Sequence, residues 1–203
     1  MQKGDVALIC ADKDKVVLST LGAIRLVVAK TLDIIPQNQY NFVWITEFPF
    51  FEWNEETQTW DAMHHPFTMP LEECIPMLDN DKGSVRATSF DLVLNGIELS
   101  SGSMRITDPA LQQKMFTLLG LTKEEIEAKF GFLVDAYKYG APAHSGAALG
   151  LDRITMIMCG AESLRDVTAF PKVQNASELM SQCPSPVNEK DLKELGIGII
   201  TEE

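Results

Sequence analysis

The dipeptide Asn95-Gly96, which lies between two apolar runs, constrains the fold of this chain more than any other feature. Asn-Gly is the strongest short signal for a two-residue turn between antiparallel strands, because both residues accept the positive φ that this turn requires. We therefore expect a hairpin with strands over 90–94 and 97–99. The small residues that follow, Ser100 to Ser103, would let a backbone or a ligand approach closely.

In the register that this turn imposes, Val93 faces Glu98 and Asp91 faces Ser100. Asp91 then lies diagonal to Glu98 on one face, where two carboxylates repel each other unless a cation lies between them. Mg²⁺ prefers oxygen ligands and usually binds through one or two carboxylates together with substrate phosphates. Asp91 and Glu98 are therefore candidate metal ligands, and a solvated strand face is the alternative explanation.

Two arginines downstream are candidate anion-binding groups. Arg105 stands between the apolar residues Met104 and Ile106, so on a strand it points away from both. Its planar guanidinium suits a carboxylate, and a surface ion pair is the alternative. Arg153 follows Gly150-Leu151-Asp152 at an expected strand-to-helix junction, where free N–H groups favour anions. Here the alternative is that Asp152 caps the helix and that the small residues before it pack tightly.

Three histidines accompany these charges. His64 and His65 are adjacent, and on extended backbone they point in opposite directions, so only one of them can face a given site. We expect His144, the third histidine, to lie within reach of the same site. A zinc site is not indicated, because no partners stand at ligand spacing.

Composition narrows the class of protein. A length of 203 residues suits one full domain, and the net charge of −12 argues against a broad nucleic-acid-binding face. No apolar run reaches the roughly 18 residues of a membrane span, and the N-terminus does not resemble a signal peptide, so we expect a cytoplasmic protein. The four cysteines are widely spaced, and we expect most of them to be buried.

The remaining pattern predicts both helices and strands. We expect an amphipathic helix over 14–32 capped by Asp12, a surface excursion over 66–88, a helix from Pro109 to Gly120 and a buried strand at 147–149. The other expected elements are a strand over 42–45, a hairpin over 50–63, two helices at 123–130 and 132–139, a helix from Asp152 that turns Ile154, Ile157 and Met158 toward the core, and a short helix near 188–195.

In their order along residues 41–187, these blocks resemble the C-terminal part of bacterial-type aspartyl-tRNA synthetases, which are class II enzymes. The stretches that carry the resemblance are FVWITEFPFFEW, AMHHPFTMP, FDLVLNGIELSSGSMRI, FGFLVDAYKYGAPAHSGAALGLDRITMIMCG and AESLRDVTAFPK. The resemblance implies an α+β fold, a class II antiparallel sheet flanked by helices, here incomplete. It implies that 1–40 is the end of an insertion domain, 41–187 the C-terminal part of the catalytic domain, and 188–203 a C-terminal extension.

The resemblance also implies a function, which is ATP-dependent activation of L-aspartate to aspartyl-adenylate and transfer of aspartate to tRNA. By the same resemblance, His64 contacts the aspartate and Arg105 binds its side-chain carboxylate. Glu98 with Asp91 holds Mg²⁺ on the ATP phosphates. Arg153 meets the γ-phosphate, and Gly150, Leu151 and Asp152 line the nucleotide. Glu98, Arg105 and Arg153 are the expected catalytic residues.

Some family features differ or are missing. Ser100-Ser101-Gly102 replaces a run of glycines, and Ala143 and Ser145 replace other family residues, all by small-for-small exchanges that we expect to be tolerated. The first two class-defining motifs and the anticodon-binding barrel are absent, so we expect a fragment of a homodimeric enzyme, inactive alone and exposing apolar surface. The competing hypothesis is a non-catalytic binding or assembly module with the same fold.

Overall fold

The computed structural model describes residues 2–198 and divides the chain into two compact units, 1–41 and 42–203. The first unit contains one helix, α1 (Asp14–Thr31), as the periodicity predicts. The predicted cap is wrong: Lys13 is the N-cap residue, and the Asp12 carboxylate accepts the Lys13 N–H at 2.6 Å. No residue of α1 is buried.

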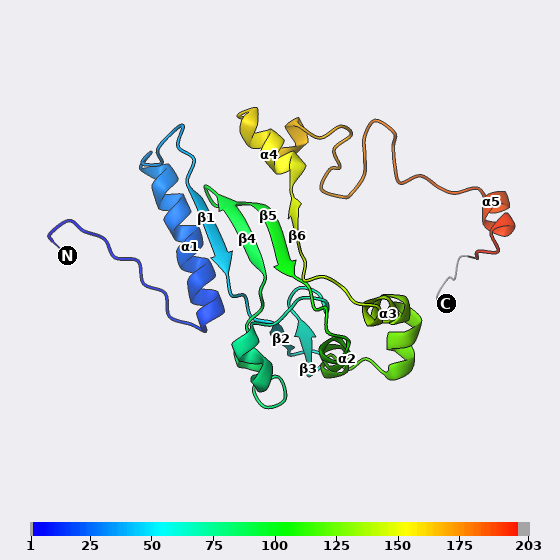
Figure 1. The fold of residues 1–203 in the computed structure, drawn as a ribbon. Coiled ribbons are helices and arrows are strands. Elements are labelled where there is room, and N and C mark those ends of the chain that lie inside the picture. Colours follow the sequence, from blue (N-terminus) through cyan, green and yellow to red (C-terminus); the bar gives the residue numbers. More distant parts are fainter. Residues whose placement is uncertain (1, 199–203) are drawn as a thin grey trace. The chain divides into compact units, whose positions relative to one another are not determined.

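The second unit mixes strands and helices, which confirms the α+β class (Figure 1). No described helix combines the length and apolarity needed to cross a membrane. The assignments of 1–40, 41–187 and 188–203 to parts of a larger enzyme stay predictions. The elements of this unit are β1 (Phe42–Thr46), β2 (Phe51–Asn54), β3 (Thr59–Ala62), η1 (Glu72–Met77), η2 (Lys82–Ser84), β4 (Phe90–Leu94), β5 (Ile97–Met104), α2 (Pro109–Leu118), α3 (Lys123–Lys138), β6 (Ser145–Leu149), α4 (Leu151–Met158), η3 (Leu164–Asp166) and α5 (Glu189–Glu194).

The main sheet has the strand order β1-β4-β5-β6, and every neighbouring pair in it is antiparallel. The expected hairpin is present, with φ of 50° at Asn95 and 83° at Gly96. Its register differs from the expectation beyond Val93, because a β-bulge leaves Leu99 without a partner in β4. Asp91 consequently faces Ser101 and not Ser100.

The helical segment between β5 and β6 is less broken than its sequence suggests. Residues 123–138 form one continuous helix, α3, so the expected break near Gly131 is wrong. A reciprocal capping box between Thr122 and Glu125 fixes its start, and Gly131 is buried within it. The Glu125 pKa is lowered by hydrogen bonds from the Thr122 backbone N–H and hydroxyl.

The core lies at the base of the sheet, and the segment 66–88 contributes to it. We expected a surface excursion there, and the exposed residues 79–81 and 83–84 agree with this, but the two ends of the segment are paired and partly buried. Bridges join Pro70 to Ala87 and Pro49 to Arg86, so the segment pairs with itself and with the chain before β2. This pairing satisfies backbone groups and leaves apolar side chains free to turn inward. The buried core residues are Phe50, Phe51, Cys74, Leu78, Val85, Ala87, Ile106 and Met115.

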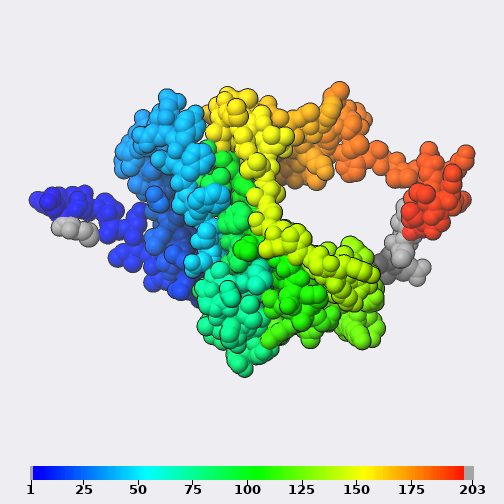
Figure 2. Space-filling view, viewed as in Figure 1, coloured from blue at the N-terminus to red at the C-terminus, as the bar shows by residue number. Residues whose placement is uncertain are grey.

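Both outer strands of the main sheet are exposed. Every residue of β6 is exposed, so the expected buried strand at 147–149 is wrong, and Figure 2 shows this stretch (yellow) at the surface. Met158 of α4 is 82% exposed, also against expectation. Cys159 and Cys183 are exposed, whereas Cys74 is buried. On β1, Phe42 and Trp44 are each 60% exposed.

An exposed apolar edge strand favours self-association, because its backbone and side chains are both available for pairing. We expect Trp44→Ser, on β1, to shift the chain toward monomer in light scattering over a concentration series. The matched control is Phe132→Ser on α3, which removes an aromatic side chain that is 78% exposed away from the sheet edge. Equal association of the native chain and the Trp44 variant would contradict this role of β1.

Candidate functional site

The bulge at Leu99 gathers the polar side chains of the hairpin on one face of the sheet. On a regular strand, residues three apart point to opposite faces, so Glu98 and Ser101 would be separated. In the structure Glu98 faces Val93 and Ser101 faces Asp91, and residues opposite each other share a face. Because Asp91 and Val93 are two apart on β4, Asp91, Glu98 and Ser101 all lie on the same face.

Asp91 carries the feature that favours a cation at this face. Its Oδ1 atom is buried and has no hydrogen-bond partner in the described part of the chain. A buried carboxylate oxygen without a donor is costly, and a hard cation removes that cost. Asp91 and Glu98 therefore fit Mg²⁺, which needs only one or two carboxylates when substrate phosphates supply further ligands.

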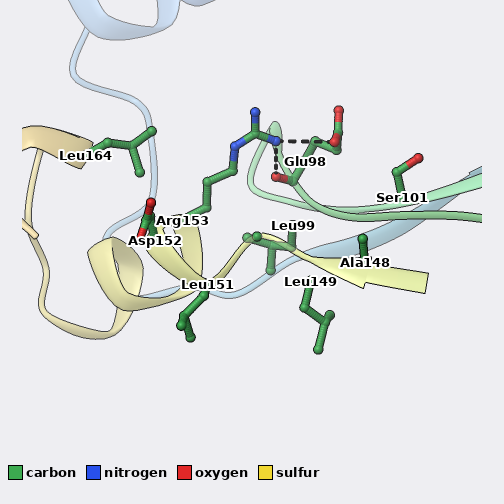
Figure 3. A pocket seen from close by; sticks show the side chains of 10 residues that line it. Glu98, Leu99, Ser101, Ala148, Leu149, Leu151, Asp152, Arg153 and Leu164 are labelled. Atoms are coloured by element: carbon green, nitrogen blue, oxygen red, sulfur yellow. Dashed lines mark hydrogen bonds and ion pairs between the residues drawn. The ribbon is translucent and has the colours of Figure 1, made fainter. Parts of the chain in front are cut away.

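A cavity of about 430 Å³, lined by Glu98 but not by Asp91, lies at the junction of β6 and α4 (Figure 3). This volume falls within the range of small-molecule sites. Figure 3 shows the Ser101 hydroxyl on the same side as the Glu98 carboxylate and the Arg153 guanidinium. The structure thus brings together all five residues predicted to contact ATP. The lining residues are Glu98, Leu99, Ser101, Ala148, Leu149, Gly150, Leu151, Asp152, Arg153 and Leu164.

The bulge and the start of α4 fix the position of Arg153. The bulged residue Leu99 accepts the Gly150 N–H at 2.8 Å, which ties the β6–α4 junction to β5. Arg153 Nη1 donates to the backbone oxygen of Glu98 at 2.6 Å and lies 3.3 Å from Glu98 Oε1. Asp152 makes no capping bond, because the N-cap is Gly150 and no side chain caps it. The capping alternative for Asp152 is therefore wrong.

The pair between Arg153 and Glu98 contributes little to folding. Their side chains are 41% and 48% exposed, and exposed ion pairs contribute about 0–1 kcal/mol. We expect Arg153→Ala to lower the free energy of unfolding by less than about 1 kcal/mol in urea titration. Lys114→Ala, which breaks the exposed pair with Asp79 at 2.6 Å, is the matched control. A loss above about 2 kcal/mol would make Arg153 a structural residue.

Arg105 directly follows β5 and lines a second cavity, of about 460 Å³. Its backbone N–H donates to the His144 carbonyl at 3.0 Å, and it forms an isolated bridge with Thr68. Its Nη1 atom is hydrogen-bonded to Ser103 Oγ and to the His65 ring. The lining residues are His65, Phe67, Arg105, Leu133, Tyr137 and His144.

The two adjacent histidines point in different directions, as expected. His64 is exposed and packs edge-on against Phe48 with ring centroids 5.2 Å apart, whereas His65 contacts Arg105. The contact of His64 with aspartate stays a prediction. The sequence placed neither His65 nor Ser101 among the site residues. The alternation of the histidine pair indicated that one of them faces the site, but it did not indicate which one.

Comparison with known proteins identifies the family of this chain. The family model described as tRNA synthetases class II (D, K and N) matches residues 13–174. The aspartate–tRNA ligase of Agathobacter rectalis is 52% identical over 200 residues, which are 98% of this chain and 33% of that protein. The aspartate–tRNA(Asp/Asn) ligase of Caldanaerobacter subterraneus subsp. tengcongensis is 53% identical over 196 residues, or 97% and 33%. The chain thus spans about a third of the length of these relatives.

Among solved structures, the aspartyl-tRNA synthetase of Entamoeba histolytica matches 85% of this chain and 29% of its own, with a TM-score of 0.51 and 24% identity. At this identity the likeness supports the fold, and the antiparallel sheet with flanking helices is confirmed. Because the family model covers most of the sequence, the chain belongs to the class II tRNA synthetases (D, K and N).

Proposed function

We propose that this chain supplies part of the active site of an aspartate–tRNA ligase. The observation that carries the proposal is the cavity lined by Glu98, Ser101 and Arg153, with Asp91 on the same face of the sheet. A cation site beside a guanidinium suits a nucleoside triphosphate, and Arg105, which directly follows β5, suits an acid. The names of the relatives at about 52% identity support aspartate as that acid.

In this proposal the reaction begins with attack on ATP. A carboxylate oxygen of aspartate bonds to the α-phosphorus, and the bond to pyrophosphate breaks, which yields aspartyl-adenylate. A hydroxyl of the tRNA then bonds to the activated carbonyl carbon and gives up its proton, and the bond to AMP breaks. Neither step needs a protein nucleophile, so the residues of this chain act by orienting the reactants and stabilising charge.

The proposed site residues have different roles in binding the two substrates. Arg105 binds the side-chain carboxylate of aspartate through its planar donor groups, and His64 is a second contact. Arg153 holds the γ-phosphate once the nucleotide displaces its pairing with Glu98. Asp91 and Glu98 would hold Mg²⁺, which neutralises phosphate charge when bound. Gly150, Leu151 and Asp152 line the nucleotide.

The partners follow from the same proposal. L-aspartate, ATP and Mg²⁺ bind at the sheet, and tRNA binds mainly through parts of the enzyme outside these 203 residues. The whole enzyme is a homodimer that works in the cytoplasm. Because the relatives are about three times as long, we propose that the 203-residue chain alone does not aminoacylate tRNA.

Aspartate-dependent ATP–pyrophosphate exchange tests the proposal. We expect no exchange above background by the 203-residue chain. We also expect exchange by a hybrid enzyme, defined as the Agathobacter rectalis relative in which this chain replaces the matched third. Asparagine, glutamate and lysine are the comparison substrates. Robust exchange by the isolated chain would overturn the expected inactivity. A folded hybrid that activates another amino acid in preference to aspartate would overturn the substrate assignment.

A further inference from the structure

Arg105 has two side-chain partners besides any substrate, and both hold the same edge of its guanidinium. Nη1 is hydrogen-bonded to Ser103 Oγ and to His65 Nε2. Ser103 is 3% exposed, and Thr68, which lies beside both His65 and Ser103, is 1% exposed. The Nη1 end of the Arg105 guanidinium is therefore fixed by side chains of the protein, while its other N–H groups remain available to the cavity.

The contact determines the protonation state of His65. A guanidinium has N–H donors and no acceptor, so His65 Nε2 must offer a lone pair. The Phe67 N–H lies 3.2 Å from His65 Nδ1, so donors face both ring nitrogens. A neutral ring satisfies one of them, and the charge-assisted bond from Arg105 is the stronger. In that tautomer the Nδ1 proton is directed to Thr68 Oγ1 at 3.3 Å, and the Phe67 N–H loses Nδ1 as its acceptor. A protonated ring would satisfy neither donor.

The segment that carries His65 is firmly anchored. The Phe67 carbonyl accepts the N–H of the fully buried Ile106 at 2.9 Å, and the Pro66 carbonyl accepts Gln112 Nε2 at 2.8 Å. The Phe67 ring packs edge-on against Phe116 and Phe130, with centroids 5.9 and 5.3 Å away. A side chain held by such packing can set the orientation of a neighbour to within the tolerance that a binding site requires.

The two cationic groups nearest His65 oppose its protonation: Arg105 is in direct contact, and His64 is its neighbour in the chain. His144 and Tyr137 also line the cavity. No carboxylate lines this cavity in the described residues. Burial lowers the pKa of His65 below its ordinary value of 6.5, and Arg105 and His64 lower it further.

We propose that His65 is a positioning residue of the acid-binding site, where its neutral imidazole accepts an N–H of Arg105 and, with Ser103, orients the guanidinium toward the carboxylate of the substrate. This inference rests on the proposed function for the identity of the acid. The contact between His65 and Arg105 itself does not depend on that function. His65 touches Arg105 and not the reacting atoms, so it acts through the arginine.

A pH dependence follows from this arrangement. The folded chain disfavours protonated His65, so the unfolded chain binds the proton more readily between pH 6.5 and the lowered pKa of the folded state. Stability from this group is complete above pH 6.5 and falls as pH drops through that window. Protonation also turns Nε2 into a donor that repels Arg105, so acid affinity falls in the same window.

Nuclear magnetic resonance of the full 203-residue chain tests the proposal. The ring nitrogens of His65 and the side-chain N–H groups of Arg105 are followed from pH 5 to 8. We expect His65 to titrate below 6.5 with Nε2 unprotonated, and its midpoint to rise in Arg105→Ala, which keeps the His65 ring. His65→Gln retains an acceptor for Arg105 and should keep slow rotation of the guanidinium, whereas His65→Ala should lose it. His144→Gln is the matched control, because it keeps the backbone carbonyl that holds Arg105.

L-aspartate is then titrated into the hybrid enzyme that carries the same substitutions, because the isolated chain spans only about a third of its relatives. We expect His65→Ala to weaken binding about tenfold or more, the scale of a lost hydrogen bond to a charged group, and His65→Gln to weaken it far less. The loss of affinity from pH 7.5 to 5.5 should disappear in His65→Gln. A His65 midpoint at or above 6.5, or unchanged affinity in His65→Ala, would overturn the positioning role. Intact coupling of His65 to Arg105 in the chain, with no aspartate binding by the folded hybrid enzyme, would overturn the proposed function and, with it, the acid-binding part of this inference.

Discussion

Gly102→Ala is expected to destabilise the second unit by about 3 kcal/mol or more, the upper part of the range for overpacked sites. Gly102 lies in β5 between Phe90 of β4 and Ala147 of β6. A methyl group there would overlap the Gly146 carbonyl oxygen and lie 2.5 Å from Phe90 Cζ. The Phe90 ring is itself packed edge-on against Trp44, and the Gly146 oxygen is backbone. Relief therefore requires β6 to move away from β5.

Urea unfolding followed by tryptophan fluorescence measures this effect, because all three tryptophans (Trp44, Trp53 and Trp60) lie in the second unit. Gly146→Ala in β6 is the matched control within the same unit, since the added carbon would meet only Arg105 Nη2 at 3.8 Å, an ordinary van der Waals contact. This variant should change the free energy of unfolding by less than about 1 kcal/mol. A Gly102 variant with the same urea midpoint of unfolding as the native chain would show that the spacing between β5 and β6 adjusts freely.

Arg105→Ala is expected to lower aspartate-dependent exchange by the hybrid enzyme by about 10²- to 10³-fold. Removing one partner of a desolvated charge pair costs about 2–5 kcal/mol, because the other charge is left without its partner. Arg105→Lys keeps the charge but not the planar fork, so it should recover only part of the loss. Initial rates at several aspartate concentrations separate a binding loss from a loss of turnover.

The control for this experiment is Arg25→Ala, which removes an exposed arginine from α1. We expect its exchange rate to stay within about twofold of the native hybrid, since surface changes are usually small in effect. An Arg105→Ala hybrid that is folded and retains native affinity for aspartate would contradict the role of Arg105 as the carboxylate-binding residue.

The local parts of the fold were predictable from sequence, for identifiable physical reasons. The hairpin follows from Asn95-Gly96, because its turn needs only two residues with positive φ. Helix α2 follows from Asp108, whose side chain accepts the Leu111 N–H at 2.8 Å, and from Pro109 at the first position. These signals act over a few residues, so tertiary packing does not override them.

The failures came where tertiary contacts decide. Gly131 was expected to break a helix, but the capping box at Thr122 and packing on one face carry α3 through it. The segment 66–88 is rich in turn residues, and its two ends contribute buried side chains because bridges to each other and to the chain before β2 satisfy their backbone, while 79–81 and 83–84 are exposed. The bulge at Leu99 has no local signal in a run of small residues, so the register beyond Val93 was wrong.

The candidate site was predictable in its residue types but not in its geometry. Glu98, Arg153 and the residues between Gly150 and Arg153 do meet in one cavity. Arg105 opens into a second cavity, and His65 supports it, which no spacing rule indicates because the contact joins residues 40 apart. Ser101 joins Glu98 on one face only because the bulge changes the alternation.

The most direct test of the account is binding of stable aspartyl-adenylate and asparaginyl-adenylate analogues to the hybrid enzyme, measured by calorimetry. The two analogues differ by one carboxylate against one amide, so their affinity ratio isolates the contribution of Arg105. We predict that the aspartyl analogue binds about 10²-fold or more tightly than the asparaginyl analogue, and that Arg105→Ala removes most of this preference. Equal affinity for both analogues in the native hybrid, or an unchanged preference in Arg105→Ala, would contradict the account.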